Sequence, residues 1–505
     1  DRTVDIVKMY QSIDSRVYLI RSEKNCGPYV ARNIALSEAS GELVTTHDAD
    51  DWSHPQKIEI QANKLLQDER RIGNISEQSR TEPGLSFYRG NNPGKIVFPS
   101  FQSFLFWRQV MVDATGCWDC VRFGADRELV RRLHVIYGKD SIQYLTTGPV
   151  TFYRKTHKSL TGNTYFGHPG FYMGARKEYF EAQTYFHNHA HSLRYTFPSS
   201  CRHFPVPYPL QVNPEQSLSR RRHYHIILAS DFRLVGGSSR SNMEEIKVQK
   251  KMGLMTGLIQ MCRYDINPSK MIIPEVREVL DFEKAHMIVY GEMVSCDLLI
   301  IRYPPVLQEW QKYLPDVEPK HICIIINQTP MSHYNEQGVQ RYDIRKCNDN
   351  IRKYYGKDGI WFPVGQQVRK ALLEYHAEDI KNIHLSSENW VNIIDVNEWK
   401  RYPQEPKLDA SKIRIGRHSR DHIVKWPVEP EQLLAVYPES DDYEIHILGG
   451  AQEAEKVLGY IPHNWRVYPF GSMHPRDFLS TLDIFVYYTR PDWVESFGRV
   501  ILEAM

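Results

Sequence analysis

Three aspartates, Asp48, Asp50 and Asp51, lie within four residues directly after an apolar segment that predicts a strand. Asp48 and Asp50 alternate in an extended segment, so their side chains can face the same side. Two convergent carboxylates suit a hard divalent cation such as Mg²⁺ or Mn²⁺, which keeps waters and also binds phosphate oxygens. A second interpretation stays open, in which Asp51 or Ser53 only caps a helix that Pro55 begins.

Two further carboxylates, Asp126 and Glu128, precede a segment with helical periodicity. Leu129 and Leu133 lie on one face of that predicted helix. An aspartate at the beginning of a helix is often an N-cap, although Leu129 three positions later excludes a capping box. The pattern alone therefore leaves Asp126 either as a helix cap or as a residue that does chemistry.

In the C-terminal part, Glu495 and Glu503 lie on either side of Gly498, across a predicted turn from a strand to a helix. Gly498 lets the backbone approach a ligand closely, and the helix that begins there offers free N–H groups to phosphate. Because any α/β unit has such turns and surface glutamates, the spacing alone does not distinguish a phosphate site from an ordinary turn.

The composition is that of a globular, multidomain chain. Its 505 residues predict about three or four domains. Lys and Arg total 63 against 61 Asp and Glu, so the net charge of +2 excludes the basic excess of a dedicated nucleic-acid binder. No segment approaches the roughly 20 apolar residues that span a bilayer. The eight cysteines are scattered, which favours a reducing compartment and hence the cytoplasm.

Short strand-like segments alternate with helical patterns, which is typical of α/β architecture. Strands are expected at Val17–Ile20 and Glu42–Thr46, with a helix over Tyr29–Ala39 between them and another beginning at Pro55. The chain is thus expected to begin in the order strand, helix, strand, loop, helix.

Two later blocks begin in the same way. One has a strand at His225–Ser230, a Gly236-Gly237 turn and a helix over Met243–Met252, and the other begins with a strand at Lys412–Gly416. The further strands expected in these blocks are Met287–Tyr290, Leu298–Ile301, Cys323–Ile326, Glu444–Leu448 and Ile484–Tyr488.

We predict a division of the chain into 1–203, 204–222, 223–405 and 406–505. Residues 204–222 hold four prolines and no steady periodicity, so they are expected to form a linker. A weaker joint is expected at Pro403–Lys407. The Arg220–Arg222 cluster leaves peripheral contact with an anionic membrane open, although three charges in a linker are more often simply solvated.

Residues 1–203 resemble a GT-A glycosyltransferase of family 2. The residues that carry the resemblance are Asn25-Cys26-Gly27, Ala31-Arg32-Asn33, Ala39-Ser40-Gly41-Glu42 and Asp48-Ala49-Asp50-Asp51. In that family the Asp-x-Asp element holds the metal bound to the donor diphosphate, which implies Mn²⁺ or Mg²⁺ on Asp48 and Asp50, with Asp51 beside them. The resemblance also implies that Asn25, Arg32 and Asp48 contact the donor, while a solvated helix face remains the alternative for Arg32.

The same resemblance implies a general base for an inverting transfer. The acidic residue at the matching place is Asp126, with Glu128 as the second candidate. Such a base must lie within hydrogen-bond reach of the acceptor hydroxyl to remove its proton. Compared with the family pattern, the domain is expected to lack two sheet strands and part of the nucleotide pocket before Asp1.

Residues 223–505 resemble the pair of Rossmann-like domains of a GT-B glycosyltransferase similar to family 4. The residues that carry this resemblance are Asp231–Ser239, Ile415–Asp421, Lys425-Trp426-Pro427, Ile447–Gly450, Asp483–Tyr487 and Glu495–Met505. The family normally continues beyond the position of Met505 with a turn, another strand and a closing helix, so this domain is also expected to be truncated.

The family 4 resemblance implies a donor site that needs no metal. It places Glu495, as a catalytic residue, and Glu503 on the donor sugar and ribose. The remaining donor-binding residues that it implies are Arg417, Arg420, Lys425, Gly498, Gly236 and Gly237. Arg and Lys would neutralise the leaving phosphate in place of a metal.

Together these features predict a bifunctional glycosyltransferase, with an inverting metal-dependent module and a retaining metal-independent module. It would transfer sugars from nucleotide-sugar donors to a glycan or lipid-linked glycan acceptor in bacterial surface polysaccharide synthesis, at the inner face of the membrane or in the cytoplasm. The alternative is a non-catalytic scaffold that binds sugars or nucleotides. The presence of five carboxylates argues against it: Asp48, Asp50, Asp126, Glu495 and Glu503.

Overall fold

The computed structural model describes residues 2–82, 84–88, 95–154, 165–167, 174–199, 202–212, 221–400, 412–490 and 493–505. The chain divides into two compact units. The first comprises Asp1–His223, Leu280–Ser295 and Lys312–Val317, and the second comprises Tyr224–Val279, Cys296–Gln311 and Glu318–Met505. Each combines sheets with helices, which confirms the predicted α/β class.

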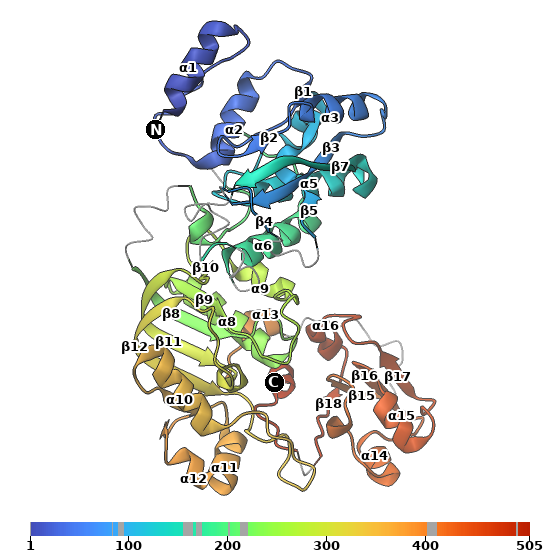
Figure 1. Cartoon of the computed structure of the whole chain (residues 1–505). Coiled ribbons are helices and arrows are strands. Elements are labelled where there is room, and N and C mark those ends of the chain that lie inside the picture. Colours follow the sequence, from blue (N-terminus) through green and yellow to red (C-terminus); the bar gives the residue numbers. More distant parts are fainter. Residues whose placement is uncertain are drawn as a thin grey trace. The chain divides into compact units, whose positions relative to one another are not determined.

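The first unit is built on a mixed sheet with the strand order β1-β6-β3-β7-β2, to which β4 and β5 add by pairing with β3. Its long strands β3 and β7 lie side by side (Figure 1). The strands are β1 (Leu43–Val44), β2 (Trp52–Ser53), β3 (Gly73–Thr81), β4 (Phe87–Tyr88), β5 (Val97–Pro99), β6 (Leu105–Trp107) and β7 (Ile142–Arg154). The long strands β3 and β7 are parallel, whereas the pairs β1·β6, β6·β3 and β7·β2 are antiparallel.

The helices of the first unit lie before, between and after these strands in the sequence. They are α1 (Thr3–Ile13), α2 (Gly27–Glu38), α3 (Lys57–Leu66), α4 (Arg108–Thr115), α5 (Ala125–Tyr137) and α6 (Ala175–His189). Short 3-10 turns occupy Phe101–Ser103, Lys139–Ser141 and Tyr208–Leu210, and β10 (Ala285–Met287) also belongs to this unit.

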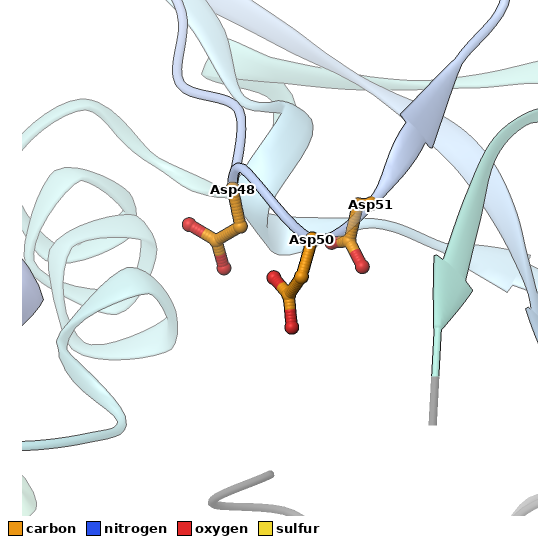
Figure 2. A group of neighbouring side chains, drawn as sticks. All are labelled: Asp48, Asp50 and Asp51. Atoms are coloured by element: carbon orange, nitrogen blue, oxygen red, sulfur yellow. The ribbon is translucent and has the colours of Figure 1, made fainter. Parts of the chain in front are cut away.

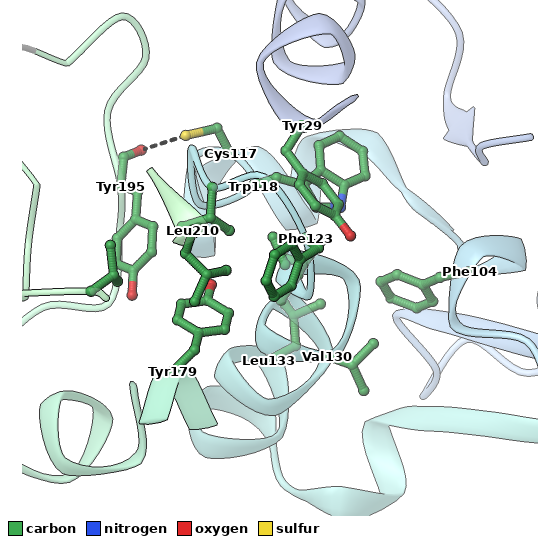
Figure 3. Packing of buried hydrophobic residues seen from close by; sticks show 14 of the residues in the cluster. Tyr29, Phe104, Cys117, Trp118, Phe123, Val130, Leu133, Tyr179, Tyr195 and Leu210 are labelled. Carbon is green, nitrogen blue, oxygen red and sulfur yellow. Dashed lines mark hydrogen bonds between the residues drawn. The ribbon is translucent and has the colours of Figure 1, made fainter. Parts of the chain in front are cut away.

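One hydrophobic core joins the sheet of the first unit to its helices (Figure 3). Leu129, Val130 and Leu133 of α5 are each at most 1% exposed and pack in the same cluster as Ile75 of β3. Their spacing places them on one side of the helix, as the sequence predicts. Because burying one such side chain is worth about 2 kcal/mol, this face fixes the rotation of α5 and so decides which way its other residues point.

The prediction of a strand at Val17–Ile20 is wrong, because this segment has no regular secondary structure. Tyr18 is 80% exposed and Ile20 is 45% exposed. A strand is stabilised by a partner and by one buried face, and this segment has neither. The second expected strand is present but short, at Leu43–Val44, and the expected helices correspond to α2 and α3.

In the second unit, a sheet places β9, β8, β11, β12, β13 and β14 side by side in that order. The strands are β8 (Arg222–Ser230), β9 (Thr256–Gln260), β11 (Met293–Arg302), β12 (Asp316–Ile326), β13 (Ile360–Pro363) and β14 (His384–Leu385). The pairs β8·β9, β12·β13 and β13·β14 are parallel, as expected of a Rossmann-like unit. Its helices are α8 (Gly237–Lys251), α9 (Pro274–Val279), α10 (Ile344–Tyr355), α11 (Gln366–Tyr375), α12 (Ala377–Ile380) and α13 (Val396–Trp399), with a 3-10 turn at Pro304–Leu307.

The C-terminal part of the second unit has its own sheet, in the parallel order β17-β16-β15-β18. The strands are β15 (Ile413–His418), β16 (Tyr443–Leu448), β17 (Trp465–Tyr468) and β18 (Ile484–Phe485). The helices are α14 (Pro430–Val436), α15 (Gln452–Leu458), α16 (Pro475–Ser480) and α17 (Arg499–Ala504), with a 3-10 turn at Ile423–Lys425.

The segment expected to be a linker begins with buried residues. Phe204, Val206 and Leu210 are at most 9% exposed and belong to the core of the first unit. Residues 213–220, which include Arg220, and the joint expected at Pro403–Lys407 lie outside the described residues. The division into four segments stays a prediction.

Membrane-spanning length is not reached by any helix in the described part of the chain, since none combines enough residues with enough apolar character.

Candidate active site

Asp48, Asp50 and Asp51 lie on the loop between β1 and β2 (Figure 2). Each offers one carboxylate oxygen, and these oxygens lie within 4.8 Å of one another. The backbone turns there, because the Asp51 N–H donates to the carbonyl oxygen of Asp48 at 3.1 Å. Figure 2 shows all three side chains on the same side of the loop. The loop thus brings together the carboxylates that the sequence singles out.

Neighbouring elements hold two of the three carboxylates in place. Asp48 accepts hydrogen bonds from Arg32 Nη2 at 2.7 Å and from Gln102 Nε2. Asp51 accepts one from the backbone N–H of Arg154, at the end of β7, at 3.0 Å. Asp50 is exposed. Two anchored carboxylates and one exposed carboxylate make a preformed cluster that is open to solvent.

The chemistry of this cluster fits a divalent cation. Burial raises the pKa of Asp51 to about 7, and the negative charges of Asp50 and Asp48 raise it further against the opposing hydrogen bond from Arg154. Three carboxylates at this distance repel one another, so a cation among them removes an unfavourable interaction. Hard oxygen ligands are the type that Mg²⁺ and Mn²⁺ prefer.

The alternative roles as helix caps are wrong. Helix α3 begins at Lys57 with Gln56 as its N-cap, and no side chain caps it, so neither Asp51 nor Ser53 has that role. Helix α5 begins at Ala125, and its N-cap is Gly124 in the left-handed conformation, at φ +95°. Asp126 is therefore inside the first turn, where its side chain is available for other contacts.

Asp126 is held by two side chains of α2. One carboxylate oxygen accepts from Arg32 Nη1 at 2.6 Å, and the other accepts from the hydroxyl of Tyr29 at 2.8 Å. Burial raises the pKa of Asp126 above the usual value of an aspartate, although Arg32 and Tyr29 act in the opposite direction. A positioned carboxylate with a raised pKa is suited to accept a proton near neutral pH.

Arg32 connects the two groups of carboxylates. Its Nη1 binds Asp126 and its Nη2 binds Asp48, and its side chain is only 12% exposed. Because one planar guanidinium bridges both, Asp126 and the Asp48 cluster belong to one site. The alternative of a solvated helix face for Arg32 is therefore wrong.

Two residues of this site, Tyr29 and Gln102, are not indicated by any of the sequence motifs. Tyr29 lies one helical turn before Arg32, so the spacing of three residues could have indicated that both face the same side of α2. Gln102 lies in a 3-10 turn far from Asp48 in the chain, and no local pattern indicates it. Asn25 is exposed, and its side chain accepts the N–H of Gly27 at the beginning of α2, at 3.1 Å.

Glu128 is placed differently from Asp126. Its side chain is fully buried and forms an ion pair with Arg132 at 2.9 Å, and His187 lies 3.0 Å from its carboxylate. Arg132 also donates to the carbonyl oxygens of Thr115 and Cys117. These contacts give Glu128 a structural role in the core of the first unit.

Glu128→Ala is therefore expected to destabilise the first unit by about 3–5 kcal/mol, because it leaves the Arg132 charge buried without its partner. Urea unfolding followed by circular dichroism measures the change. Glu59→Ala, at an exposed glutamate on α3, serves as the control and should shift unfolding by no more than about 0.5 kcal/mol. An unfolding curve like that of the unsubstituted chain would show that Glu128 does not stabilise this core.

In the C-terminal part, Glu495 meets a lysine and a tyrosine. Its carboxylate accepts from Lys425 Nζ and from the hydroxyl of Tyr487, the latter at 2.6 Å. The Gly498 N–H donates to the same carboxylate at 3.3 Å, and Gly498 adopts φ +70°, which favours glycine. The structure thus brings together Lys425, Glu495 and Gly498.

Glu503 is 5% exposed and lies on α17. Arg499 Nε donates to its carboxylate at 2.7 Å, and His418 Nε2 lies 3.4 Å from it. Burial lowers the pKa of His418 to about 4, and the charges of Arg240 and Arg417 lower it further. His418 is therefore neutral at pH 7, and Arg499 supplies the charge that balances Glu503.

The remaining predicted residues occupy different surroundings. Arg417 is 2% exposed, packs over the ring of Trp426 at 3.6 Å and donates to the carbonyl oxygen of Lys425. Arg420 is exposed. Gly236 adopts φ +150° and precedes α8, which begins at Gly237. Arg417 is thus held in the core of the C-terminal sheet, whereas Arg420 is accessible.

Sequence comparison gives a family for the N-terminal part. Residues 1–130 match the family model Glycosyl transferase family 2. A putative teichuronic acid biosynthesis glycosyltransferase TuaG of Bacillus subtilis is 39% identical over 67 residues, which are 13% of this chain and 27% of that protein. An uncharacterized glycosyltransferase MJ1057 of Methanocaldococcus jannaschii is 37% identical over 68 residues, which are 14% of this chain and 23% of that protein.

The chain therefore spans about a quarter of the length of the curated relatives it matches. The matches bear out the family 2 resemblance of the N-terminal part. The family 4 resemblance of the C-terminal part stays a prediction.

Solved structures show weaker likenesses. A glycosyltransferase from Rickettsia africae ESF-5 has 17% identity and a TM-score of 0.35, over 56% of this chain and 76% of that chain. S. aureus TarS 1–349 in complex with UDP-GlcNAc has 15% identity and a TM-score of 0.29, over 37% of this chain and 53% of that chain. These scores are too low to establish a common fold.

Proposed function

We propose that the first unit catalyses an inverting transfer of a sugar from a nucleotide-sugar donor to a glycan acceptor. The observation that carries the proposal is the bridge from Asp48 through Arg32 to Asp126. It joins a carboxylate cluster suited to a divalent cation and a shielded carboxylate suited to proton transfer. The family 2 match over residues 1–130 supports the same reaction.

In this proposal the residues of the chain have separate tasks. Asp48, Asp50 and Asp51 hold Mn²⁺ or Mg²⁺, which when bound would neutralise charge on the diphosphate leaving group. Asp126 accepts the proton of the acceptor hydroxyl. At the same time, the hydroxyl oxygen bonds to the anomeric carbon of the donor sugar, and the bond from that carbon to the phosphate oxygen breaks. Arg32 and Tyr29 keep the Asp126 carboxylate oriented. Both oxygens retain lone pairs for an acceptor hydroxyl.

The name of one relative supports a proposal for the substrate class. That relative is named for teichuronic acid biosynthesis, so we propose a surface polysaccharide or its lipid-linked precursor as the acceptor, at the cytoplasmic face of the membrane. The alternative remains a scaffold that binds nucleotide sugars without turnover.

The experiment that separates these functions incubates the 505-residue chain with a panel of UDP-, GDP- and dTDP-sugars and Mn²⁺. Release of free nucleotide is measured with and without EDTA. An enzyme is expected to release nucleotide from at least one donor, and EDTA should abolish that release. Binding of a donor without any release, with all acceptors tried, would favour the scaffold.

We further propose that the second unit holds an independent donor site of the GT-B family 4 type, in which transfer is retaining and needs no metal. The specific observation in its favour is the contact of Glu495 with Lys425 and Tyr487 beside Gly498. A lysine in this place can neutralise a phosphate, and Glu495 can then turn to the donor sugar. Glu503 lies on α17, which begins directly after Gly498, and its charge is balanced by Arg499.

Glu495→Ala is expected to abolish donor binding and transfer at this second site, because Lys425 loses the carboxylate that positions it. Transfer that is resistant to EDTA is the readout, together with isothermal titration of the donor. The control is Glu431→Ala, at an exposed glutamate of α14. If the EDTA-sensitive transfer fell instead, Glu495 would belong to the same reaction as Asp48, and the proposal of two sites would be wrong.

A further inference from the structure

Three arginines of the first unit lie without carboxylate partners near Asp126. They are Arg80 on β3, Arg127 on α5 and Arg176 on α6. Within the described ranges of the chain, none of the three forms an ion pair, although Arg80 and Arg176 are half-buried and arginines withdrawn from water are usually paired. The Nε of Arg80 is buried and has no hydrogen-bond partner.

Aromatic rings contact these guanidinium groups, and Arg176 Nε also donates to the carbonyl oxygen of Phe166 at 2.6 Å. Arg80 lies over Phe98 and Tyr153, with its guanidinium carbon 5.5 and 5.7 Å from the ring centroids. The corresponding distances are 4.8 Å for Arg127 over Phe101 and 4.6 Å for Arg176 over Phe123. Ring faces orient a guanidinium but leave most of its N–H groups free to donate.

The three charges act on one another. Burial lowers the pKa of Arg176 to about 10, and the charges of Arg127 and Arg80 lower it further. Burial and the charge of Arg80 also lower the pKa of Arg127. Like charges brought close together are unfavourable unless an anion joins them.

The cluster is adjacent to the proposed base. Arg127 follows Asp126 directly, and the Asp126 charge favours the protonated form of Arg127. Tyr29, which donates to Asp126, interacts electrostatically with Arg176. An acceptor whose hydroxyl reaches Asp126 therefore brings its neighbouring groups toward Arg127 and Arg176, and Arg80 interacts electrostatically with both.

We propose that Arg80, Arg127 and Arg176 bind an anionic group, a phosphate or a carboxylate, carried by the acceptor. This inference rests on the proposed glycosyl transfer and names the class of acceptor, an anionic rather than a neutral glycan. Planar guanidinium groups suit both anions, because each can donate two parallel hydrogen bonds. In the proposed function, the cation held by Asp48, Asp50 and Asp51 neutralises the donor diphosphate. The arginines are therefore available to bind a different anion.

The test measures binding of three small probes to the 505-residue chain by isothermal titration, with UDP and Mn²⁺ saturating. The probes are glucose 6-phosphate, methyl β-D-glucuronide and methyl β-D-glucoside, which carry a phosphate, a carboxylate and no charge. Comparison of the first two identifies the source of the anion. We expect at least one anionic probe to bind about tenfold or more tightly than the neutral one, with a preference that weakens as salt rises.

Arg80→Gln and Arg176→Gln are each expected to weaken binding of the preferred anionic probe by about tenfold, because each loses a charged donor. Arg80→Lys should retain part of it, since the charge remains without the planar fork. Arg70→Gln, at an arginine whose side chain is 85% exposed, is the control and should bind like the unsubstituted chain. Thermal unfolding by circular dichroism verifies that each variant is folded.

Three results would overturn the inference. They are equal binding of charged and neutral probes, anion binding that the two glutamine variants leave intact, and a parallel loss of UDP affinity, which would assign the arginines to the donor diphosphate. A failure of the proposed function is distinguishable from a failure of this inference, because it would appear as absent nucleotide binding in the unsubstituted chain. Titration of the probes without UDP would still measure anion binding by the arginines.

Discussion

Asp126→Asn is expected to lower the transfer rate of the metal-dependent reaction by about 10³-fold while leaving donor affinity nearly unchanged. Asparagine keeps the shape, and its oxygen can accept from Arg32 while its amide N–H donates to the hydroxyl oxygen of Tyr29, but it cannot take a proton from the acceptor. Since a base acts in the transition state, its loss appears in kcat and not in the binding of the donor. Single-turnover kinetics and titration of the donor measure the two quantities separately.

The pH dependence gives a second readout for Asp126. A base must be deprotonated, so kcat/KM is expected to rise with pH as Asp126 loses its proton. Because burial raises the pKa of Asp126, this rise should lie above the usual aspartate value of about 3.9. Asp140→Asn, at an exposed aspartate, should retain both the rate and the profile. Unchanged turnover in Asp126→Asn would assign the proton transfer to another group.

The second large effect is expected for the carboxylate cluster. Asp50→Ala should weaken Mn²⁺-dependent donor binding by about 10²-fold, because a hard cation loses one of three charged ligands and the donor loses its bridge to the protein. Because the Asp50 side chain is exposed, its removal should leave the folded structure unchanged. Titration of the donor over a range of Mn²⁺ concentrations measures the effect.

Asp48→Ala is expected to have a smaller effect on the metal and an additional effect on the base, because it frees Arg32 from one of its two partners. The control for both is Asp5→Ala, at an exposed aspartate of α1. Retention of normal Mn²⁺ dependence in both Asp50→Ala and Asp48→Ala would contradict the metal assignment.

Several features of this site follow from local sequence. The strand before Asp48, the helix that carries Arg32 and the apolar face of α5 are each set by a short periodic pattern, and such patterns depend on neighbouring residues alone. The proximity of Asp48, Asp50 and Asp51 likewise follows from their spacing on one loop. The family resemblance adds the expected roles of these carboxylates, and the match over residues 1–130 bears out the family.

Other local expectations fail for a physical reason. The segment Val17–Ile20 has apolar residues of strand type, but a strand forms only when another strand offers its hydrogen bonds. The expected caps at Asp51 and Asp126 have the right residue type, yet backbone turns at Gln56 and Gly124 fix where α3 and α5 begin.

The sequence by itself determined that this chain is an α/β protein with clusters of carboxylates at the ends of predicted strands and helices, because residue type and spacing are local properties. Only the tertiary structure decided which carboxylates act together. Arg32 meets Asp126 across 94 residues of chain, and the same fold directs Glu128, two residues further along, into the core toward Arg132. The packed face of α5 sets this difference, because the rotation of a helix is decided by what it is packed against and not by the residues it exposes.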